Sequence, residues 1–180
     1  MIYKTNFFGW DVDVTPLKNT QKAIIIEAPH TSNWDFFIGI YAALKLKLPF
    51  KFIIKNNWDI PIIGSILKYL GAIFIDRSKS SGLTKQLGHQ MAGIKKGYLV
   101  FTPEGTRSRV NKWKTGFYHI AKNSKLPIAI AYIDYKTKKI GIYNTFFPTN
   151  NMQEDFNKIR EFYKTINAKK PQNFNENWDI

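Results

Sequence analysis

Short apolar runs alternate along this chain with longer segments whose apolar residues recur every three or four positions. The short runs carry few polar residues and are typical of strands buried in a sheet. The longer segments predict helices with one apolar side, as in 81–96, which ends before Gly97. The pattern predicts strands at residues 9–14, 22–27, 50–55, 72–75, 98–101, 126–135 and 139–145, and helices at 35–47, 58–70, 81–96, 115–125 and 152–168.

The order of these elements indicates the fold class. Strands that alternate with helices favour an α/β fold with a mostly parallel central sheet flanked by helices. The exception is the pair 126–135 and 139–145, which the polar turn KTKK joins into an antiparallel hairpin. The 180 residues contain no linker or repeat, so we expect a single domain over 1–180. Residues 1–20 are expected to form an N-terminal strand or arm, and residues 169–180 a polar tail.

Composition narrows the class of protein. Hydrophobic residues make up 44% of the chain, which excludes a disordered protein. The absence of cysteine excludes disulfides and thiolate chemistry, and it fits a reducing cytosol. A net charge of +14 points to nucleic acid, an anionic membrane or a phosphorylated substrate as the partner, unless the lysines only solvate the surface. No signal peptide is expected, and the most apolar window, 60–75, falls short of the ~20 residues of a membrane span.

The clearest chemical signal is the sequence PHTSNWDF at residues 29–36, where a predicted strand ends and a helix begins. Open α/β sheets place their ligands at such junctions. A short loop could fold the His30 imidazole onto the Asp35 carboxylate and pair a general base with an orienting group. Ser32 and Asp35 also fit a helix capping box, and the two roles do not exclude each other.

Two further strand ends carry arginine, in a chain with 23 lysines and only four arginines. One is GAIFIDRS at 71–78, and the other is VFTPEGTRS at 100–108. Arginine offers phosphate a planar fork that lysine lacks, although these arginines could instead pair with neighbouring carboxylates as loop staples. The candidate binding residues at these two strand ends are Arg77, Glu104, Gly105, Thr106 and Arg107.

The three blocks HTSNWD, FIDRS and PEGTRS, in this order and at these separations, resemble the signature blocks of the glycerolipid acyltransferase family. The best-known members are the 1-acyl-glycerol-3-phosphate, or lysophosphatidic acid, acyltransferases. The resemblance covers about residues 9–135, and LPIAIAYIDY at 126–135 is similar to a looser fourth block. Three departures stand out: hydrophobic N-terminal helices are missing, Ala129 replaces a usual proline, and RVNKWKTGFY follows the usual pattern only loosely.

The resemblance implies a role for each candidate residue. His30 would be the general base on the acceptor hydroxyl, and Asp35 would hold its tautomer. Arg77 would contact the acceptor phosphate. The remaining candidates, which would bind and position the acceptor, are Glu104, Gly105, Thr106 and Arg107.

The implied reaction moves a fatty acyl group from an acyl thioester to the hydroxyl of a lysophospholipid in phospholipid biosynthesis. The thioester, either acyl-CoA or acyl carrier protein, is a co-substrate, and no cofactor, metal or covalent enzyme intermediate is implied. One alternative is a hydrolase that uses the same pair against the thioester. The other is a basic nucleic-acid-binding protein, but no recognisable binding module supports it, so no nucleic-acid partner is expected.

The lipid substrates also imply a place of action. We expect a peripheral protein on the inner, cytoplasmic face of the cytoplasmic membrane, where its lysines are attracted to anionic lipid. Apolar residues of 58–70, together with Phe7, Phe8 and Trp10, could insert shallowly. The alternative is that 58–70 is a buried core helix.

Overall fold

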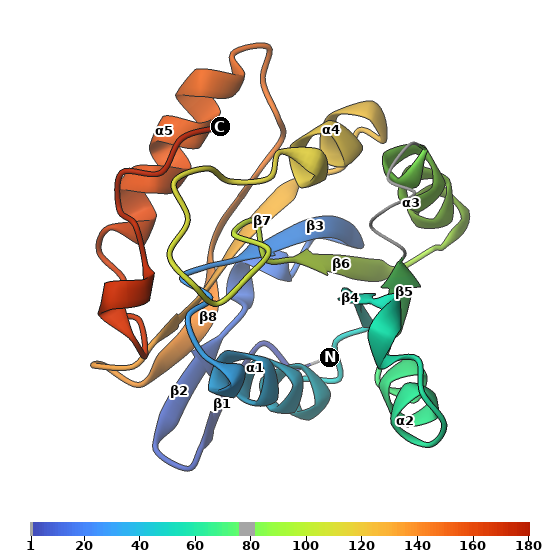
Figure 1. Ribbon diagram of the computed structural model, residues 1–180, viewed down its shortest axis with the longest axis horizontal. Helices are drawn as coiled ribbons and strands as arrows, with labels where there is room; N and C mark the ends of the chain where they lie inside the picture. The colour runs from blue at the N-terminus through green and yellow to red at the C-terminus, as the bar shows by residue number, and fades with distance from the viewer. Residues whose placement is uncertain (1, 76–81) are drawn as a thin grey trace.

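Helices cover both faces of a twisted sheet in this computed structural model, which describes residues 2–75 and 82–180 (Figure 1). Within these residues the strands form one eight-stranded sheet of order β1-β2-β8-β7-β3-β6-β4-β5. The pairs β1–β2 and β7–β8 are antiparallel, and the other neighbours are parallel. The predicted fold class, a mostly parallel α/β sheet with an antiparallel hairpin, is confirmed.

Most element bounds lie within a few residues of the predicted ones, but β1 was not predicted and α2 and α5 are shorter than expected. The strands are β1 (Lys4–Phe7), β2 (Trp10–Asp13), β3 (Lys22–Glu27), β4 (Phe50–Lys55), β5 (Ala72–Ile75), β6 (Gly97–Phe101), β7 (Ile128–Asp134) and β8 (Lys139–Phe146). The helices are α1 (Asn33–Lys45), α2 (Ile63–Tyr69), α3 (Leu83–Gly93), α4 (Gly116–Asn123) and α5 (Met152–Tyr163), with short 3-10 turns η1 (Thr15–Leu17), η2 (Asn56–Trp58) and η4 (Pro171–Asn173).

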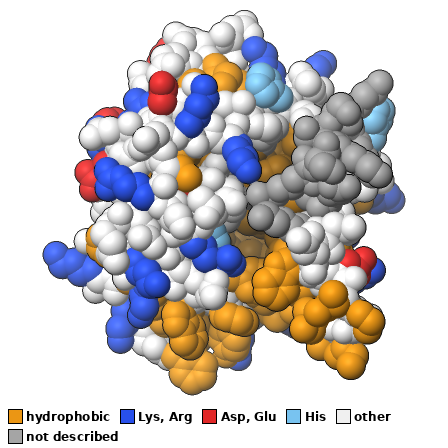
Figure 2. Space-filling model, in the orientation of Figure 1, with side chains coloured by type: hydrophobic (Ala, Val, Ile, Leu, Met, Phe, Trp, Pro, Cys, Tyr) orange, Lys and Arg blue, Asp and Glu red, His pale blue; other side chains and the backbone are white. Residues whose placement is uncertain are grey.

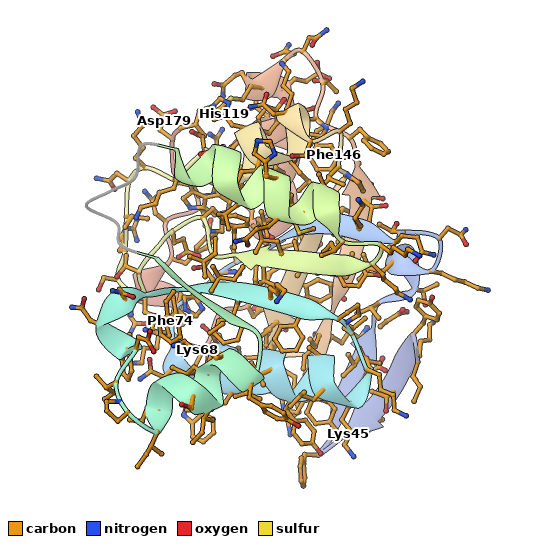
Figure 3. All side chains as sticks on the ribbon, turned by 90° about the vertical axis from the view of Figure 1, so that its right-hand side faces the viewer. Lys45, Lys68, Phe74, His119, Phe146 and Asp179 are labelled. Atoms are coloured by element: carbon orange, nitrogen blue, oxygen red, sulfur yellow. The ribbon has the colours of Figure 1, made fainter. Side chains whose placement is uncertain are left out.

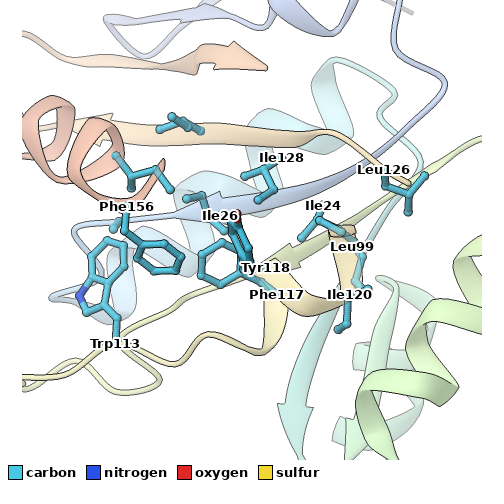
Figure 4. Packing of buried hydrophobic residues seen from close by; sticks show 14 of the residues in the cluster. Ile24, Ile26, Leu99, Trp113, Phe117, Tyr118, Ile120, Leu126, Ile128 and Phe156 are labelled. Carbon is cyan, nitrogen blue, oxygen red and sulfur yellow. The ribbon is translucent and has the colours of Figure 1, made fainter. Parts of the chain in front are cut away.

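Strand β3 lies at the centre of the sheet and is buried on both faces. Ile24 and Ile26 belong to one hydrophobic core, whereas Ala23 and Ile25 belong to the other, as the alternation of side chains along a strand requires. The first core packs beneath α3, α4 and α5 (Figure 4). Helices α1 and α2 lie on the opposite side of the sheet from α3 in two perpendicular views (Figures 1 and 3). Parallel pairing on both sides of β3 aligns the carboxyl ends of β3, β6 and β7 at one edge.

The segment 58–70 differs from both the length and the burial expected of a core helix. Pro61 precedes a helix that begins only at Ile63, and the backbone of Ile62 has a positive φ of 70°. Within α2 only Gly64 and Leu67 are buried. The alternative of a buried core helix is therefore wrong, and most of this apolar segment faces outward. None of the helices in the described ranges is long and apolar enough to cross a bilayer.

The C-terminal residues also differ from the polar tail that was expected. Trp178 is 1% exposed and stacks on Trp113 with ring centroids 3.7 Å apart. Phe174 is buried too, and Arg160 of α5 lies over the Trp178 ring. Two large apolar side chains therefore anchor a segment that is polar on average, so its mean composition did not reveal its packing.

Candidate functional site

The site lies where the loops after β3, β6 and β7 meet. The loop after β3 carries His30, and the loop after β6 carries Glu104. Glu104 Oε1 accepts the backbone N–H of His30 at 2.6 Å, across 74 residues of sequence. Tyr135 directly follows β7, and its hydroxyl donates to Asp35 Oδ1 at 2.6 Å. His30, Asp35 and Glu104 therefore lie together at one edge of the sheet.

Asp35 combines the two roles considered for it. Its Oδ2 accepts the N–H groups of Thr31 and Ser32, each at 2.8 Å, while Ser32 Oγ accepts from Trp34, which completes the capping box. The same Oδ2 lies 3.5 Å from His30 Nδ1. Asp35 is 2% exposed, so the helix start fixes its carboxylate beside the imidazole.

Glu27 is a second carboxylate at His30, and the sequence interpretation missed it. Its Oε2 lies 3.3 Å from His30 Nδ1, slightly closer than Asp35 Oδ2. Burial lowers the pKa of His30, but the charges of Glu27 and Asp35 reverse the effect, so the pKa is raised overall. Burial raises the pKa of Glu27, against the opposing charge of His30. The signal in the sequence was a charged residue closing an otherwise apolar strand, three positions before the histidine.

Glu104 lies beneath the His30 loop. It is 3% exposed, and burial raises its pKa to about 7 even though the His30 N–H favours its charged form. The resemblance assigned Glu104 to the acceptor, and such a contact stays a prediction. In this structure its carboxylate holds the backbone of the general-base candidate.

The rest of the loop after β6 is exposed at its tip. Gly105 has a positive φ of 69°, and an added Cβ would lie 2.8 Å from Lys114 Nζ, so the turn favours glycine. Thr106 and Arg107 are exposed. The charge of Arg107 lowers the pKa of both His30 and Glu27, which means that its guanidinium acts on the same site.

The other arginines have different positions. Arg77 lies outside the described residues. Arg109 donates to the Phe174 carbonyl and to Asn175 Oδ1, each at 3.3 Å, so it staples its loop to the C-terminal segment through neutral oxygens rather than through a neighbouring carboxylate. The two arginines of GTRSR therefore serve different purposes: one is bonded to the C-terminal segment, and Arg107 is exposed beside the site.

The C-terminal segment also supports the site. The N–H of Lys170 donates to Thr31 Oγ1 at 3.2 Å, and Asn173 Nδ2 donates to the Arg107 carbonyl at 3.0 Å. The ammonium of Lys169 lies 5.2 Å from the centre of the Tyr135 ring. Both functional loops are therefore held from outside by residues after α5. No short motif marked these contacts, because they depend on how the chain returns across the sheet.

Three side chains could in principle share a metal ion. Ligand atoms of Glu27, His30 and Asp35 lie within 4.8 Å of one another. However, the Asp35 oxygens already accept three hydrogen bonds, from Thr31, Ser32 and Tyr135. A group whose lone pairs are so occupied is a poor metal ligand, and the arrangement fits a proton on Nδ1 better than a cation.

Similar proteins share a common description. The chain is 35% identical over 104 residues to a chloroplast 1-acyl-sn-glycerol-3-phosphate acyltransferase of Brassica napus, covering 55% of this chain and 30% of that protein. A probable enzyme of the same name from Mycoplasma pneumoniae is 32% identical over 123 residues, which cover 65% of this chain and 46% of the relative. The Saccharomyces cerevisiae protein of that name is 27% identical over 88% of this chain and 58% of its own length.

These matches cover about a third to three-fifths of the length of each relative. The family model described as Acyltransferase matches residues 11–133, which is more than half of the chain. This range contains Glu27, His30, Asp35 and Glu104. The chain belongs to the acyltransferase family.

Proposed function

We propose that this protein transfers a fatty acyl group from an acyl thioester to the hydroxyl of a lysophospholipid such as 1-acyl-glycerol 3-phosphate. The observation that carries the proposal is the buried His30 imidazole, whose Nδ1 faces two carboxylates at the edge of the sheet. The names of the similar proteins support this acceptor. In this proposal the protein takes part in phospholipid biosynthesis.

The reaction follows from the orientation of the imidazole. With Nδ1 turned to the carboxylates, Nε2 is the nitrogen left for the acceptor hydroxyl. Nε2 takes the hydroxyl proton as the oxygen attacks the thioester carbonyl, which gives a tetrahedral oxyanion. The C–S bond then breaks, the acyl ester is formed, and the leaving thiolate takes the proton from Nε2. Asp35 holds the tautomer and stabilises the imidazolium formed between these steps.

The acceptor's phosphate is proposed to lie against arginine. Arg107 is exposed beside His30, and Arg77 would contribute a second fork. Thr106 and the Gly105 turn would complete the binding loop and approach the acceptor closely. The donor is acyl-CoA or acyl carrier protein, and the proposed chemistry uses neither a metal nor another cofactor. Dialysis against EDTA should therefore leave turnover unchanged, whereas activity restored only by a divalent ion would contradict this part.

The membrane is the proposed place of action. The net charge of +14 would attract the protein to anionic lipid on the cytoplasmic face, at about 1 kcal/mol for each basic residue near the surface. Binding to vesicles rich in phosphatidylglycerol should exceed binding to neutral vesicles, and it should weaken as salt shortens the screening length. Equal binding to both kinds of vesicle would overturn electrostatic docking.

One assay tests the reaction directly. Lysolipids with and without phosphate are offered together with acyl-CoA or acylated carrier protein, and the products are separated. We expect diacyl product from the phosphorylated lysolipid and stoichiometric release of the thiol. Release of free fatty acid without acylated lipid would replace the transferase by a thioester hydrolase.

A further inference from the structure

The outer side of α1 is apolar between its two exposed ends, Asn33 and Lys45. From Asn33 to Leu44 the only charged residue is Asp35, which is buried in the site. Trp34, Phe37 and Leu44 are more than half exposed, and their spacing of three and seven residues places them on one stripe. A helix that faces water normally carries polar residues there, so α1 lacks the outer face of an ordinary surface helix.

The segment before and along α2 extends this apolar surface. Figure 2 shows hydrophobic side chains gathered over the part of the molecule where Figure 1 places α1 and α2. The segment's two charged side chains, Asp59 and Lys68, pair with each other at 2.8 Å. We define the α1–α2 face as the exposed residues Trp34, Phe37, Leu44, Trp58, Ile60, Ile62, Ile63, Ile66 and Tyr69.

We propose that the α1–α2 face inserts into the surface of the lipid bilayer that holds the acceptor, an inference that rests on the proposed function. Nine exposed large apolar residues form a patch of the kind that marks an interaction site. Aliphatic residues bordered by tryptophan and tyrosine are typical of a membrane interface. The net charge of +14 makes the molecule complementary to anionic lipid rather than to a second copy of itself.

The position of the face fits the chemistry. Trp34 belongs to the same helix start as the capping box, four residues after His30. Insertion of α1 would therefore bring the general-base candidate to the level of the lipid headgroups. An acceptor could then present its hydroxyl without leaving the bilayer.

Two exposed isoleucines provide the test. Ile62 and Ile66 are 75% and 54% exposed, so Ile62→Asp and Ile66→Asp change the face without opening a core. Partitioning of the full chain onto phosphatidylglycerol vesicles is measured by sedimentation at fixed salt. Each variant is expected to bind at least about tenfold more weakly, because a carboxylate resists transfer into the interface. The control Phe147→Asp alters an equally exposed apolar residue outside the face and should bind as wild type does.

Activity separates this inference from the proposed function. With a short-chain, monomeric lysolipid, Ile62→Asp and Ile66→Asp should turn over as wild type does, and they should lose activity only on vesicle-bound acceptor. Wild-type partitioning of both variants would overturn insertion through this face. A dimer in lipid-free solution that these variants dissociate would also overturn it, because a second copy would then cover the face.

A separate observation concerns the imidazole. Each Asp35 oxygen already accepts at least one hydrogen bond, whereas Glu27 Oε1 is buried without a hydrogen-bond partner in the described part of the chain. His30 Nδ1 is likewise buried without one, and Glu27 Oε2 is its nearer carboxylate oxygen, at 3.3 Å. A short movement on substrate binding would turn this contact into a hydrogen bond.

We infer that Glu27 is a positioning residue that accepts the Nδ1 proton of His30 in a hydrogen bond, and so holds the tautomer together with Asp35, whose carboxylate also secures the loop. Glu27 is the last residue of the central strand β3, so the sheet holds its backbone in place. Asp35, in contrast, already accepts hydrogen bonds from three donors. The inference deepens the proposed function. Among residues 2–75 and 82–180, the ionisable groups around His30 are Glu27 from β3, Asp35 from α1, Glu104 and Arg107 from the loop after β6, and Tyr135 after β7, which acts through Asp35.

The pH profile of kcat/KM for Glu27→Gln is the decisive measurement. Loss of the Glu27 charge removes a group that favours the imidazolium, so the acidic limb should move to lower pH by about half a unit or more. Turnover should fall about tenfold with little change in either KM. Glu27→Asp, which keeps the charge, should keep the wild-type limb, and so should the control Glu154→Gln on α5.

Two outcomes would overturn the role of Glu27. One is a folded Glu27→Gln variant whose turnover and acidic limb in the pH profile of kcat/KM are the same as in wild type. The other is an equal loss in Glu27→Gln and Glu27→Asp with no movement of the limb, which would mean that the side chain only fills space. Absence of any acyl transfer by wild type would instead count against the proposed function.

Discussion

The hydroxyl of Tyr135 donates a hydrogen bond of 2.6 Å to Oδ1 of Asp35, 100 residues earlier in the chain. Asp35 Oδ2 accepts two loop N–H groups, and the bond from Tyr135 fixes Oδ1, so both oxygens of the carboxylate are held. Trp10 packs edge-on against the Tyr135 ring and limits its movement. The residue that follows β7 thereby holds the start of α1 through one carboxylate.

Tyr135→Phe should weaken both the fold and the reaction. The change leaves Asp35 Oδ1 without its donor, and a lost hydrogen bond to a charged group costs about 1.5–3 kcal/mol. We expect the free energy of unfolding in urea to fall by roughly that amount, and turnover to fall as well, because the carboxylate gains freedom to turn away from His30. Tyr143→Phe, at an exposed position, is the control. Unchanged stability and turnover would show that the Tyr135 hydroxyl is dispensable.

His30→Ala should lower turnover by about 10²–10⁴ while the protein stays folded, because it removes the proposed general base. His119→Ala is the matched control, since that histidine is exposed on α4. Turnover is measured with acyl-CoA and a phosphorylated lysolipid, and folding is checked by thermal unfolding. A folded His30→Ala with near-wild-type turnover would rule out the base.

Arg107→Lys should weaken use of a phosphorylated acceptor more than use of the acyl donor. Lysine keeps the charge but loses the planar fork that grips phosphate. The KM for the phosphorylated lysolipid should rise, with little change for an acceptor without phosphate, and Arg77→Lys is expected to behave alike. Arg109→Lys is the control in the same loop, because its partners are protein atoms. Equal losses on both acceptors would make Arg107 another staple.

Glu104→Gln should raise stability at pH 8 more than at pH 5. Burial lifts the pKa of Glu104 to about 7, above its ordinary value of 4.5. The folded state thus keeps a proton that the unfolded state loses as pH rises from 4.5 to 7, so the wild type loses stability across that window. The neutral amide removes this loss of stability, which is on the order of 3 kcal/mol above pH 7.

The unfolding temperatures of Glu104→Gln and wild type at the two pH values provide the check. Exposed Glu154→Gln should show no such difference. If Glu104→Gln raises the unfolding temperature as much at pH 5 as at pH 8, the result would contradict a raised pKa of Glu104.

Trp178→Ala should destabilise the protein strongly. The indole is buried and stacks on Trp113, and removal of so large a buried ring costs about 3–5 kcal/mol. The midpoint of urea unfolding measures the loss. Trp58→Ala, at an exposed position, should leave the midpoint almost unchanged. Similar small effects of both changes would mean that the C-terminal segment contributes little to stability.

Much of the fold could be predicted because its signals are local. β3, β4 and β5 lie where the apolar runs predicted them, and the hairpin of β7 and β8 follows its polar turn. β1 was missed because it is a short edge strand whose residues alternate between exposed and half-buried, which leaves no apolar run. The outward face of α2 was undecided, because periodicity does not tell a buried apolar side from one that meets no protein partner.

The site was predictable only where its residues share a motif. His30 and Asp35 lie on one loop and one helix turn, and Glu104 belongs to a block with a recognisable spacing. Glu27 and Tyr135 complete the same cluster, but their contacts arise from strand order and from the end of β7, which no spacing within a motif encodes. The arginines show the same limit: residue type does not distinguish Arg107 from Arg109 in the same loop, and only the partners of Arg109 separate them.

The packing of residues 170–179 against the loop after β6 has a consequence for biosynthesis. Arg109 and Val110 are translated about 65 residues before their partners Phe174 and Asn175. At roughly 5–20 residues per second, that interval lasts about 3–13 s on a ribosome. During this interval β3 and β6 have already been translated, but the loop that carries Glu104 and Arg107 lacks its contacts with the C-terminal segment. A nascent chain should therefore complete the support of this loop only after these late residues have emerged, so the proposed acyl transfer is expected only once residues 170–179 have packed.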